Sequence, residues 1–211
     1  MLAGSAARLM RGASGRTNST RRSSTGFSRS RLQSAYRPAP TGRGWQRCAV
    51  PGGKTSDPLA LLDALNAERV EYIIVGGATA ALHGAPVTTQ DLDIVHRLTR
   101  PNVRRLKRVL DRLHATVREP EARNVTPDES HLLAPGQLRL LTDFGPLDVV
   151  GRLHDGRSYD DLLPQSELLR DGTRKLRVVN LPTLIDIKAT TGRRRDQIVL
   201  PILRELLRRR R

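Results

Sequence analysis

Aromatic side chains and cysteine are scarce in this chain of 211 residues. Aromatic residues make up 3% of it, which disfavours a stacking platform for the bases of single-stranded nucleic acid. The one cysteine, Cys48, excludes an intramolecular disulfide framework and any multi-cysteine zinc or iron–sulfur site. Five scattered histidines show no metal-ligand spacing. The buried area must therefore come mainly from Leu, Val, Ile and Ala.

Long apolar runs are also absent from the sequence. The longest obvious run is YIIV at Tyr72–Val75, whereas a membrane-spanning helix needs roughly 20 apolar residues. Together with the single cysteine, this predicts a soluble, cytoplasmic protein that does not act at a membrane.

Acidic residues are missing from one part of the chain. Residues 1–53 contain ten Arg and no Asp, Glu or Lys, although the whole chain has 37 basic and 21 acidic residues and a net charge of +16. The segment is rich in Arg and Ser and lacks hydrophobic periodicity, so we predict a disordered basic tail over 1–53 and a folded domain over 54–211. Three interpretations of the tail stay open: a transit peptide, a nucleic-acid-binding arm, or translation from an upstream start codon.

Hydrophobic periodicity and turn residues divide 54–211 into helices and strands. Helices are predicted for about a dozen residues after Asp57 and over 78–84, 101–117, 182–190 and 194–209, with a kink or break at Pro201. Strands are predicted over 71–75, 91–95, 137–143, 147–150 and 175–179, and a loop over 118–131.

Two acids on one predicted strand suggest a metal-dependent site. Asp91 and Asp93 are two residues apart, so their side chains share one face of the strand, and their charges repel each other unless a cation intervenes. Carboxylate oxygens suit Mg²⁺ or Mn²⁺, and a pair of such ions can orient a triphosphate and an attacking hydroxyl. Asp148, on the strand over 147–150, is a candidate third carboxylate. Gly76-Gly77 precedes a helix and would let the backbone approach phosphate oxygens closely.

Three sequence segments together resemble a known family. They are VGGATAALHGAPVTTQDLDIV, with 13 residues between Gly77 and Asp91; FGPLDVVG, which contains Asp148; and LPTLIDIKATTGRRRDQIVLPIL, which contains Lys188, Arg193 and Asp196. They resemble the DNA polymerase beta superfamily of nucleotidyltransferases, in its minimal bacterial branch that includes abortive-infection and toxin–antitoxin members. The resemblance covers about residues 57–207 and excludes the tail.

The resemblance implies an α/β (α+β) fold, with a mixed, mostly antiparallel sheet flanked by helices. It implies transfer of a nucleoside monophosphate from an NTP to a hydroxyl, with release of pyrophosphate and with Mg²⁺ or Mn²⁺ as cofactor, in a setting such as phage defence. By position, the implied catalytic and metal-binding residues are Asp91, Asp93 and Asp148, and the implied nucleotide-binding residues are Gly76, Gly77, Thr79, Lys188 and Arg193. Two positions depart from the pattern: Gly77 stands where many relatives carry Ser, and Val87 where many carry Arg.

The acceptor, the base of the NTP and the oligomeric state stay open. A protein side chain, an RNA end such as that of tRNA, and a small molecule all provide a hydroxyl. The Arg100, Arg104, Arg108 and Arg112 stripe and the run over 208–211 could attract a polyanion, although such stripes are more often solvated faces. Two other classes of function compete with the enzyme: a non-catalytic, antitoxin-like nucleotide-binding partner, and a basic RNA-binding module with incidental carboxylates.

Overall fold

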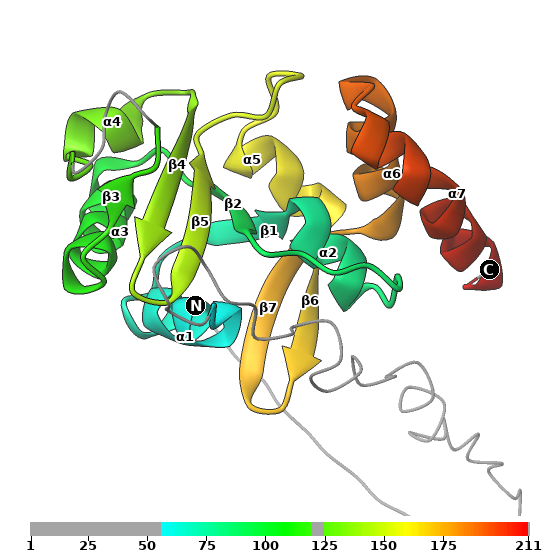
Figure 1. Ribbon diagram of the computed structural model, residues 1–211, viewed down its shortest axis with the longest axis horizontal. Helices are drawn as coiled ribbons and strands as arrows, with labels where there is room; N and C mark the ends of the chain where they lie inside the picture. The colour runs from blue at the N-terminus through cyan, green and yellow to red at the C-terminus, as the bar shows by residue number, and fades with distance from the viewer. Residues whose placement is uncertain (1–55, 120–124, 211) are drawn as a thin grey trace, which may run out of the picture. The chain divides into compact units, whose positions relative to one another are not determined.

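The computed structural model describes residues 56–119 and 125–210 (Figure 1). The tail predicted over 1–53 lies outside these residues. The helices are α1 (Pro58–Ala67), α2 (Gly76–Leu82), α3 (Arg100–Arg112), α4 (Glu129–Leu133), α5 (Tyr159–Leu162), the short 3-10 helix η3 (Leu163–Gln165), α6 (Leu181–Thr191) and α7 (Arg194–Arg209). The strands are β1 (Tyr72–Val75), β2 (Leu92–His96), β3 (Thr116–Val117), β4 (Gln137–Thr142), β5 (Gly145–Val150), β6 (Ser166–Asp171) and β7 (Arg174–Val179).

All of the described strands form one sheet. Its seven strands lie in the order β3-β4-β5-β2-β1-β7-β6. The pairs β1–β7 and β2–β5 are parallel, whereas β1–β2, β3–β4, β4–β5 and β6–β7 are antiparallel. The predicted fold class, a mixed and mostly antiparallel sheet flanked by helices, is therefore confirmed.

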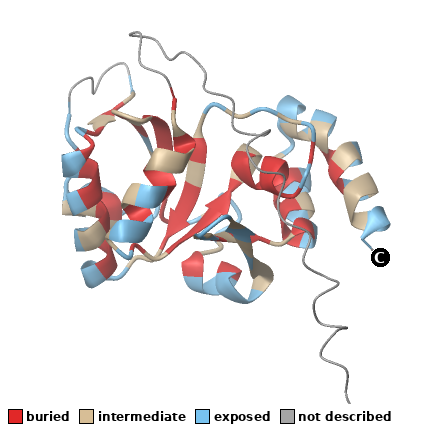
Figure 2. Ribbon diagram, turned by 90° about the horizontal axis from the view of Figure 1, so that it is seen from below, coloured by how far each residue is buried: buried red, intermediate tan, exposed pale blue. Residues whose placement is uncertain are grey.

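The sheet buries apolar side chains on both faces, and its central strands are coloured as buried in Figure 2. Successive strand residues point to opposite faces, so Ile74 of β1 joins a core that includes residues of α1, α3 and α4. Its neighbours Ile73 and Val75 join a second core with residues of α5, α6 and α7. We call these the first face and the second face of the sheet.

The ends of the first and last helices follow the sequence signals. Asp57 caps α1 by accepting a hydrogen bond from Ala60 N–H at 3.1 Å, and Pro58 occupies the first turn. Helix α7 runs through Pro201, so the predicted break does not occur. Pro201 is exposed, which lets water satisfy the carbonyl group that loses its helical donor.

None of the helices within 56–119 and 125–210 combines the length and the apolar character that a membrane span needs.

Some short elements and helix ends differ from the prediction. Helix α3 ends at Arg112, because His114 adopts a left-handed conformation with φ of 47° and reverses the chain into β3. The predicted loop over 118–131 includes the start of α4, which Asp128 caps through His131 N–H. Strand β6 was not predicted, because its residues alternate between half-buried and exposed and Leu168 is 54% exposed.

A buried amide links α3 to the ends of β1 and β2. The Asn102 side chain is fully buried, accepts a hydrogen bond from Glu71 N–H at 2.7 Å, and donates to the carbonyl oxygens of Glu71 and Arg97 at 2.9 and 3.0 Å. It thereby satisfies three backbone groups on the chain that enters β1 and leaves β2, the strand of the predicted acids.

Replacing Asn102 with Ala should lower the free energy of unfolding by about 2–3 kcal/mol, because three backbone groups would lose their partner in a buried position. Chemical denaturation followed by circular dichroism measures this loss. The exposed Arg100 on the same helix is the matched control, and Arg100→Ala should stay within about 0.5 kcal/mol. Equal, small effects of both substitutions would contradict the account.

Candidate active site

The three predicted acids lie together on the second face of the sheet. Asp93 and Asp148 are direct neighbours in the parallel register of β2 and β5. Asp91 immediately precedes β2 and has the same side-chain parity as Asp93. Leu92 and Ile94, between and beyond them, belong to the core of the first face, as the sequence pattern predicted. The two segments of chain therefore bring their carboxylates to one side of the sheet.

Burial and mutual repulsion act on two of these acids. Burial, together with the charges of Asp148 and Asp91, raises the pKa of Asp93 to about 7, although Lys188 and the Gly77 N–H oppose the shift. Burial also raises the pKa of Asp148, with a contribution from Asp91, against the opposing effects of Arg118 and Gln137. Each ionised carboxylate thus increases the energy needed to ionise its neighbour, so the cluster favours a bound positive charge.

The glycine pair accommodates one of these acids. Gly76 and Gly77 are the first residues of α2, so the helix begins earlier than the predicted 78. Gly76 has φ of 68°, and a Cβ atom there would lie 2.1 Å from Asp93 Oδ2. The Gly77 N–H donates to Asp93. What the sequence suggested as room for a phosphate is, in this structure, room for the Asp93 carboxylate.

Two predicted nucleotide-binding residues are engaged elsewhere. The Thr79 side chain is fully buried and its hydroxyl donates to the Ile74 carbonyl oxygen at 2.8 Å. The structure therefore does not bring this hydroxyl to the acids, and its hydrogen bond joins α2 to β1. Arg193 is exposed at the N-cap of α7, where its charge contributes to lowering the pKa of Asp196 rather than shifting those of Asp93 or Asp148.

Lys188 is closer to the acids. Its side chain is largely buried in α6, and its positive charge acts to lower the pKa of Asp93. Its amino group also donates to Asp196 of α7, which accepts a second hydrogen bond from the Thr191 hydroxyl at 2.7 Å. Burial tends to raise the pKa of Asp196, but these two donors outweigh it and lower the pKa. Lys188 therefore joins α6 to α7 while its charge reaches the acid cluster.

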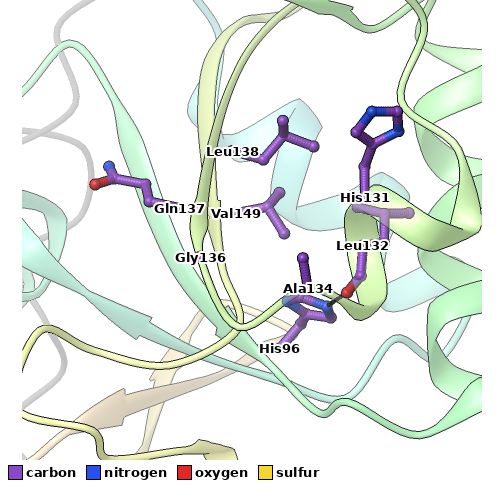
Figure 3. A pocket seen from close by; sticks show the side chains of 8 residues that line it. All are labelled: His96, His131, Leu132, Ala134, Gly136, Gln137, Leu138 and Val149. Carbon is purple, nitrogen blue, oxygen red and sulfur yellow. Dashed lines mark hydrogen bonds between the residues drawn. The ribbon is translucent and has the colours of Figure 1, made fainter.

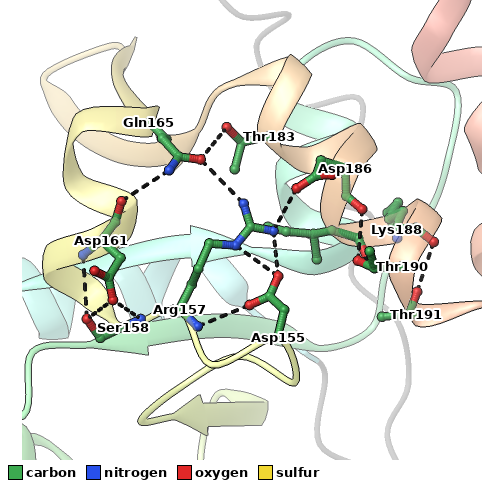
Figure 4. Close-up of polar contacts among 11 residues, drawn as sticks. Asp155, Arg157, Ser158, Asp161, Gln165, Thr183, Asp186, Lys188, Thr190 and Thr191 are labelled. Carbon is green, nitrogen blue, oxygen red and sulfur yellow. Dashed lines mark hydrogen bonds and ion pairs between the residues drawn. The ribbon is translucent and has the colours of Figure 1, made fainter.

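An arginine-centred network contacts α6 through Thr183 and Asp186 (Figure 4). The Arg157 guanidinium contacts Asp155 at 2.5 Å and Asp186 of α6 at 3.0 Å. It also donates to Gln165 Oε1 at 3.3 Å, and that oxygen accepts from the Thr183 hydroxyl. The network fixes α6 against η3 and the loop after β5, which sets the position from which Lys188 acts.

Two polar residues at the site were missed by the sequence reasoning. Arg118 Nη2 lies 2.8 Å from Asp148 Oδ1 and 3.4 Å from Asp91 Oδ2, and Gln137 Nε2 donates to Asp148 Oδ2 at 2.8 Å. Arg118 follows the two-residue strand β3 inside a predicted loop, so no periodicity marked it. Gln137 begins a predicted strand, and its distance from Asp148 follows only from the β4–β5 register.

The donor chemistry of the site fits divalent cations. Carboxylate oxygens are the ligands that hard divalent cations prefer, and three carboxylates lie on this face of the sheet. The Arg118 guanidinium contacts two of them. Among the described residues, no group of three or more His, Cys, Asp or Glu side chains is assembled closely enough to hold a metal ion. Arg118 contacts both Asp91 and Asp148, so the positive charge of its guanidinium partly offsets the charge of these two acids.

A separate cavity lies across the sheet from the acids (Figure 3). It has a volume of about 150 Å³, and its lining includes His96, Leu132, Leu138 and Val149. Val149 belongs to the core of the first face, whereas the Gln137 side chain points away from the other residues in the view. His96 places both ring nitrogens near carbonyl oxygens, at 2.8 and 3.1 Å, and burial lowers its pKa. His96 and His83 are both buried.

Three of the four arginines in the α3 stripe lie in ion pairs with two glutamates. Arg108 and Arg112 pair with Glu68, and Arg104 lies 3.8 Å from Glu129. Near the end of α7, Arg208 and Arg209 pair with Glu205. These pairs favour the interpretation of both arginine groups as solvated, ion-paired faces.

Comparison with known proteins identifies no family for this chain. No protein-family profile and no curated protein matches the chain. A solved structure of a candidate nucleotidyltransferase from Thermotoga maritima overlaps 72% of this chain and 91% of its own, with 20% sequence identity and a TM-score of 0.44. At that score the overlap carries no weight for function.

Replacing Gly76 with Ala should lower the free energy of unfolding by about 2 kcal/mol or more, because the residue has positive φ and the new methyl group would overlap Asp93. Thermal melting compares it with Gly77→Ala, whose Cβ would meet only the Thr89 side chain, at 3.0 Å. A Gly76→Ala protein as stable as Gly77→Ala would show that Asp93 does not occupy this position.

The stability of the metal-free protein should fall as the pH rises through the titration of Asp93. Its pKa is 3.8 when unperturbed and about 7 in the folded chain, so the folded state retains this proton between those values and ionisation disfavours folding. Relative to wild type, Asp93→Asn should gain about 1–3 kcal/mol between pH 4 and pH 7.5, measured by urea denaturation with a chelator present. A constant difference across this range would refute the shift.

Proposed function

We propose that this protein transfers a nucleoside monophosphate from an NTP to a hydroxyl acceptor and releases pyrophosphate. The observation that carries the proposal is the meeting of Asp91, Asp93 and Asp148 on one face of the sheet beside Gly76. The cluster has unfavourable mutual repulsion, so it favours binding of hard divalent cations.

Asp91, Asp93 and Asp148 would hold the ions, either Mg²⁺ or Mn²⁺. When bound, such ions neutralise charge on a triphosphate and polarise its reacting phosphate. The acceptor oxygen forms a bond to the α-phosphorus. The bond between the α-phosphorus and the oxygen that bridges it to the β-phosphate breaks, and pyrophosphate leaves with the electron pair. The hydroxyl proton passes to a carboxylate or to solvent, and Asp148, whose pKa burial raises, is the proposed recipient.

Residues of α2 and α6 would support nucleotide binding. Lys188 places a positive charge near Asp93, which would attract the triphosphate. Gly76 and Gly77 would allow the backbone to approach phosphate oxygens once the Asp93 side chain turns toward an ion. Arg193, which is exposed at the N-cap of α7, would contact a phosphate or the acceptor. The base of the NTP and the acceptor stay open, and a toxin–antitoxin or phage-defence setting and the cytoplasmic location remain predictions.

One observation favours a second candidate, a non-catalytic nucleotide-binding or antitoxin-like partner protein. Arg118 already satisfies Asp91 and Asp148, and the described residues hold no assembled metal group. This alternative predicts NTP binding that survives Asp91→Ala combined with Asp93→Ala. The catalytic proposal predicts that metal-dependent binding is lost.

Transfer is tested with the full chain, Mg²⁺ and each of the four α-³²P-labelled NTPs, alone and with cell extract. Label should appear on an acceptor, and Asp93→Asn or Asp148→Asn should reduce the rate at least about 100-fold, because each removes a carboxylate from the charged cluster. Asp111→Asn is the matched control, since Asp111 is an exposed acid on α3 paired with Lys107, and it should leave the rate unchanged. Absence of label from every acceptor would count against catalysis.

A further inference from the structure

Arg118 contacts two of the three acids directly. One nitrogen of its guanidinium, Nη2, contacts Asp148 Oδ1 at 2.8 Å and Asp91 Oδ2 at 3.4 Å. The residue follows β3 at the edge of the sheet, where its N–H donates to the Arg139 carbonyl oxygen at 2.9 Å. Its side chain must therefore reach past β4 to contact β5 and the start of β2.

These contacts engage the carboxylate that is least accessible to solvent. The Asp148 side chain is 7% exposed, whereas those of Arg118 and Asp91 are 32% and 37% exposed. Arg118 takes one oxygen of Asp148, and Gln137 takes the other at 2.8 Å. A cation that approached Asp148 would therefore meet an oxygen already bound to a positive charge.

We propose that Arg118 is an internal counter-ion that competes with divalent cations for Asp91 and Asp148. This inference rests on the proposed function, which assigns the cations to these acids. In the resting protein, the guanidinium neutralises part of the like-charge repulsion of the cluster. A cation binds to these acids only when the guanidinium leaves them, so Arg118 sets the cation affinity of the site.

Arg139 provides a matched control for the general effect of positive charge. It lies directly opposite Asp148 in the β4–β5 register, and its charge acts to lower the pKa of Asp148. Its own guanidinium lies 3.9 Å from Glu119. Removing Arg139 therefore changes the nearby charge but leaves the bridge between Asp91 and Asp148 in place.

The test measures Mn²⁺ binding to the full chain without nucleotide, by electron paramagnetic resonance of the free ion. Arg118→Met should lower the Kd for Mn²⁺ about tenfold, because the acids lose their competitor, whereas Arg139→Met should change it by less than about threefold. Adding Asp148→Asn to Arg118→Met should abolish the gain, which places the bound ion at this cluster. A gain in affinity is not an outcome that local unfolding would produce.

Unchanged or weaker Mn²⁺ binding by Arg118→Met would overturn the proposal, and so would equal gains in both arginine variants. Thermal melting checks that each variant is folded, and Arg118→Gln, with the same expected gain, replaces Arg118→Met if the latter does not fold. The nucleotidyl-transfer assay separates the two claims. Tighter Mn²⁺ binding by Arg118→Met, with no transfer by wild type, would support the counter-ion role of Arg118 and refute the proposed function. Transfer by wild type, with no tighter Mn²⁺ binding by Arg118→Met, would support the proposed function and refute the counter-ion role.

Discussion

Repulsion among three carboxylates on one face of the sheet is the constraint around which the site is organised. The parallel register of β2 and β5 places Asp93 beside Asp148, and strand alternation adds Asp91 to the same side. Such a cluster is stable only if protons, hydrogen-bond donors or cations offset its charge. The fold supplies all three, through the raised pKa of Asp93, the Gly77 N–H, and the nearby Lys188 and Arg118.

The surrounding elements can be understood as supports for this arrangement. The Gly76 backbone leaves the space that the Asp93 carboxylate fills, and no residue with a Cβ atom could do so without displacing it. The Asn102 amide fixes the backbone that enters β1 and leaves β2. The Arg157 network contacts α6, from which the charge of Lys188 reaches Asp93.

Much of this arrangement could be predicted from local sequence patterns. Alternation in DLDIV placed Asp91 and Asp93 opposite Leu92 and Ile94, and the short runs YIIV and LDVV are buried strands as expected. The missed features depend on contacts between distant residues. Arg118 meets Asp148 across 30 positions in the sequence, and no local pattern marks such a pair. Thr79 was expected to bind nucleotide beside the glycines, but its hydroxyl donates a hydrogen bond to the Ile74 carbonyl oxygen. This contact follows from the packing of α2 on β1. The end of α3 was misplaced because Val117 continues the apolar spacing of Leu110 and Leu113, although the chain has already turned at His114 and Val117 lies in β3.

The most direct test of the acid cluster is a crystal structure of the full chain with Mn²⁺ and a non-hydrolysable NTP, read by anomalous scattering. The account predicts Mn²⁺ at roughly 2.1–2.2 Å from carboxylate oxygens of Asp93 and Asp148, with the Arg118 guanidinium displaced from Asp148. Nucleotide bound at another surface, with Arg118 still bridging Asp91 and Asp148 and no anomalous peak beside them, would contradict it.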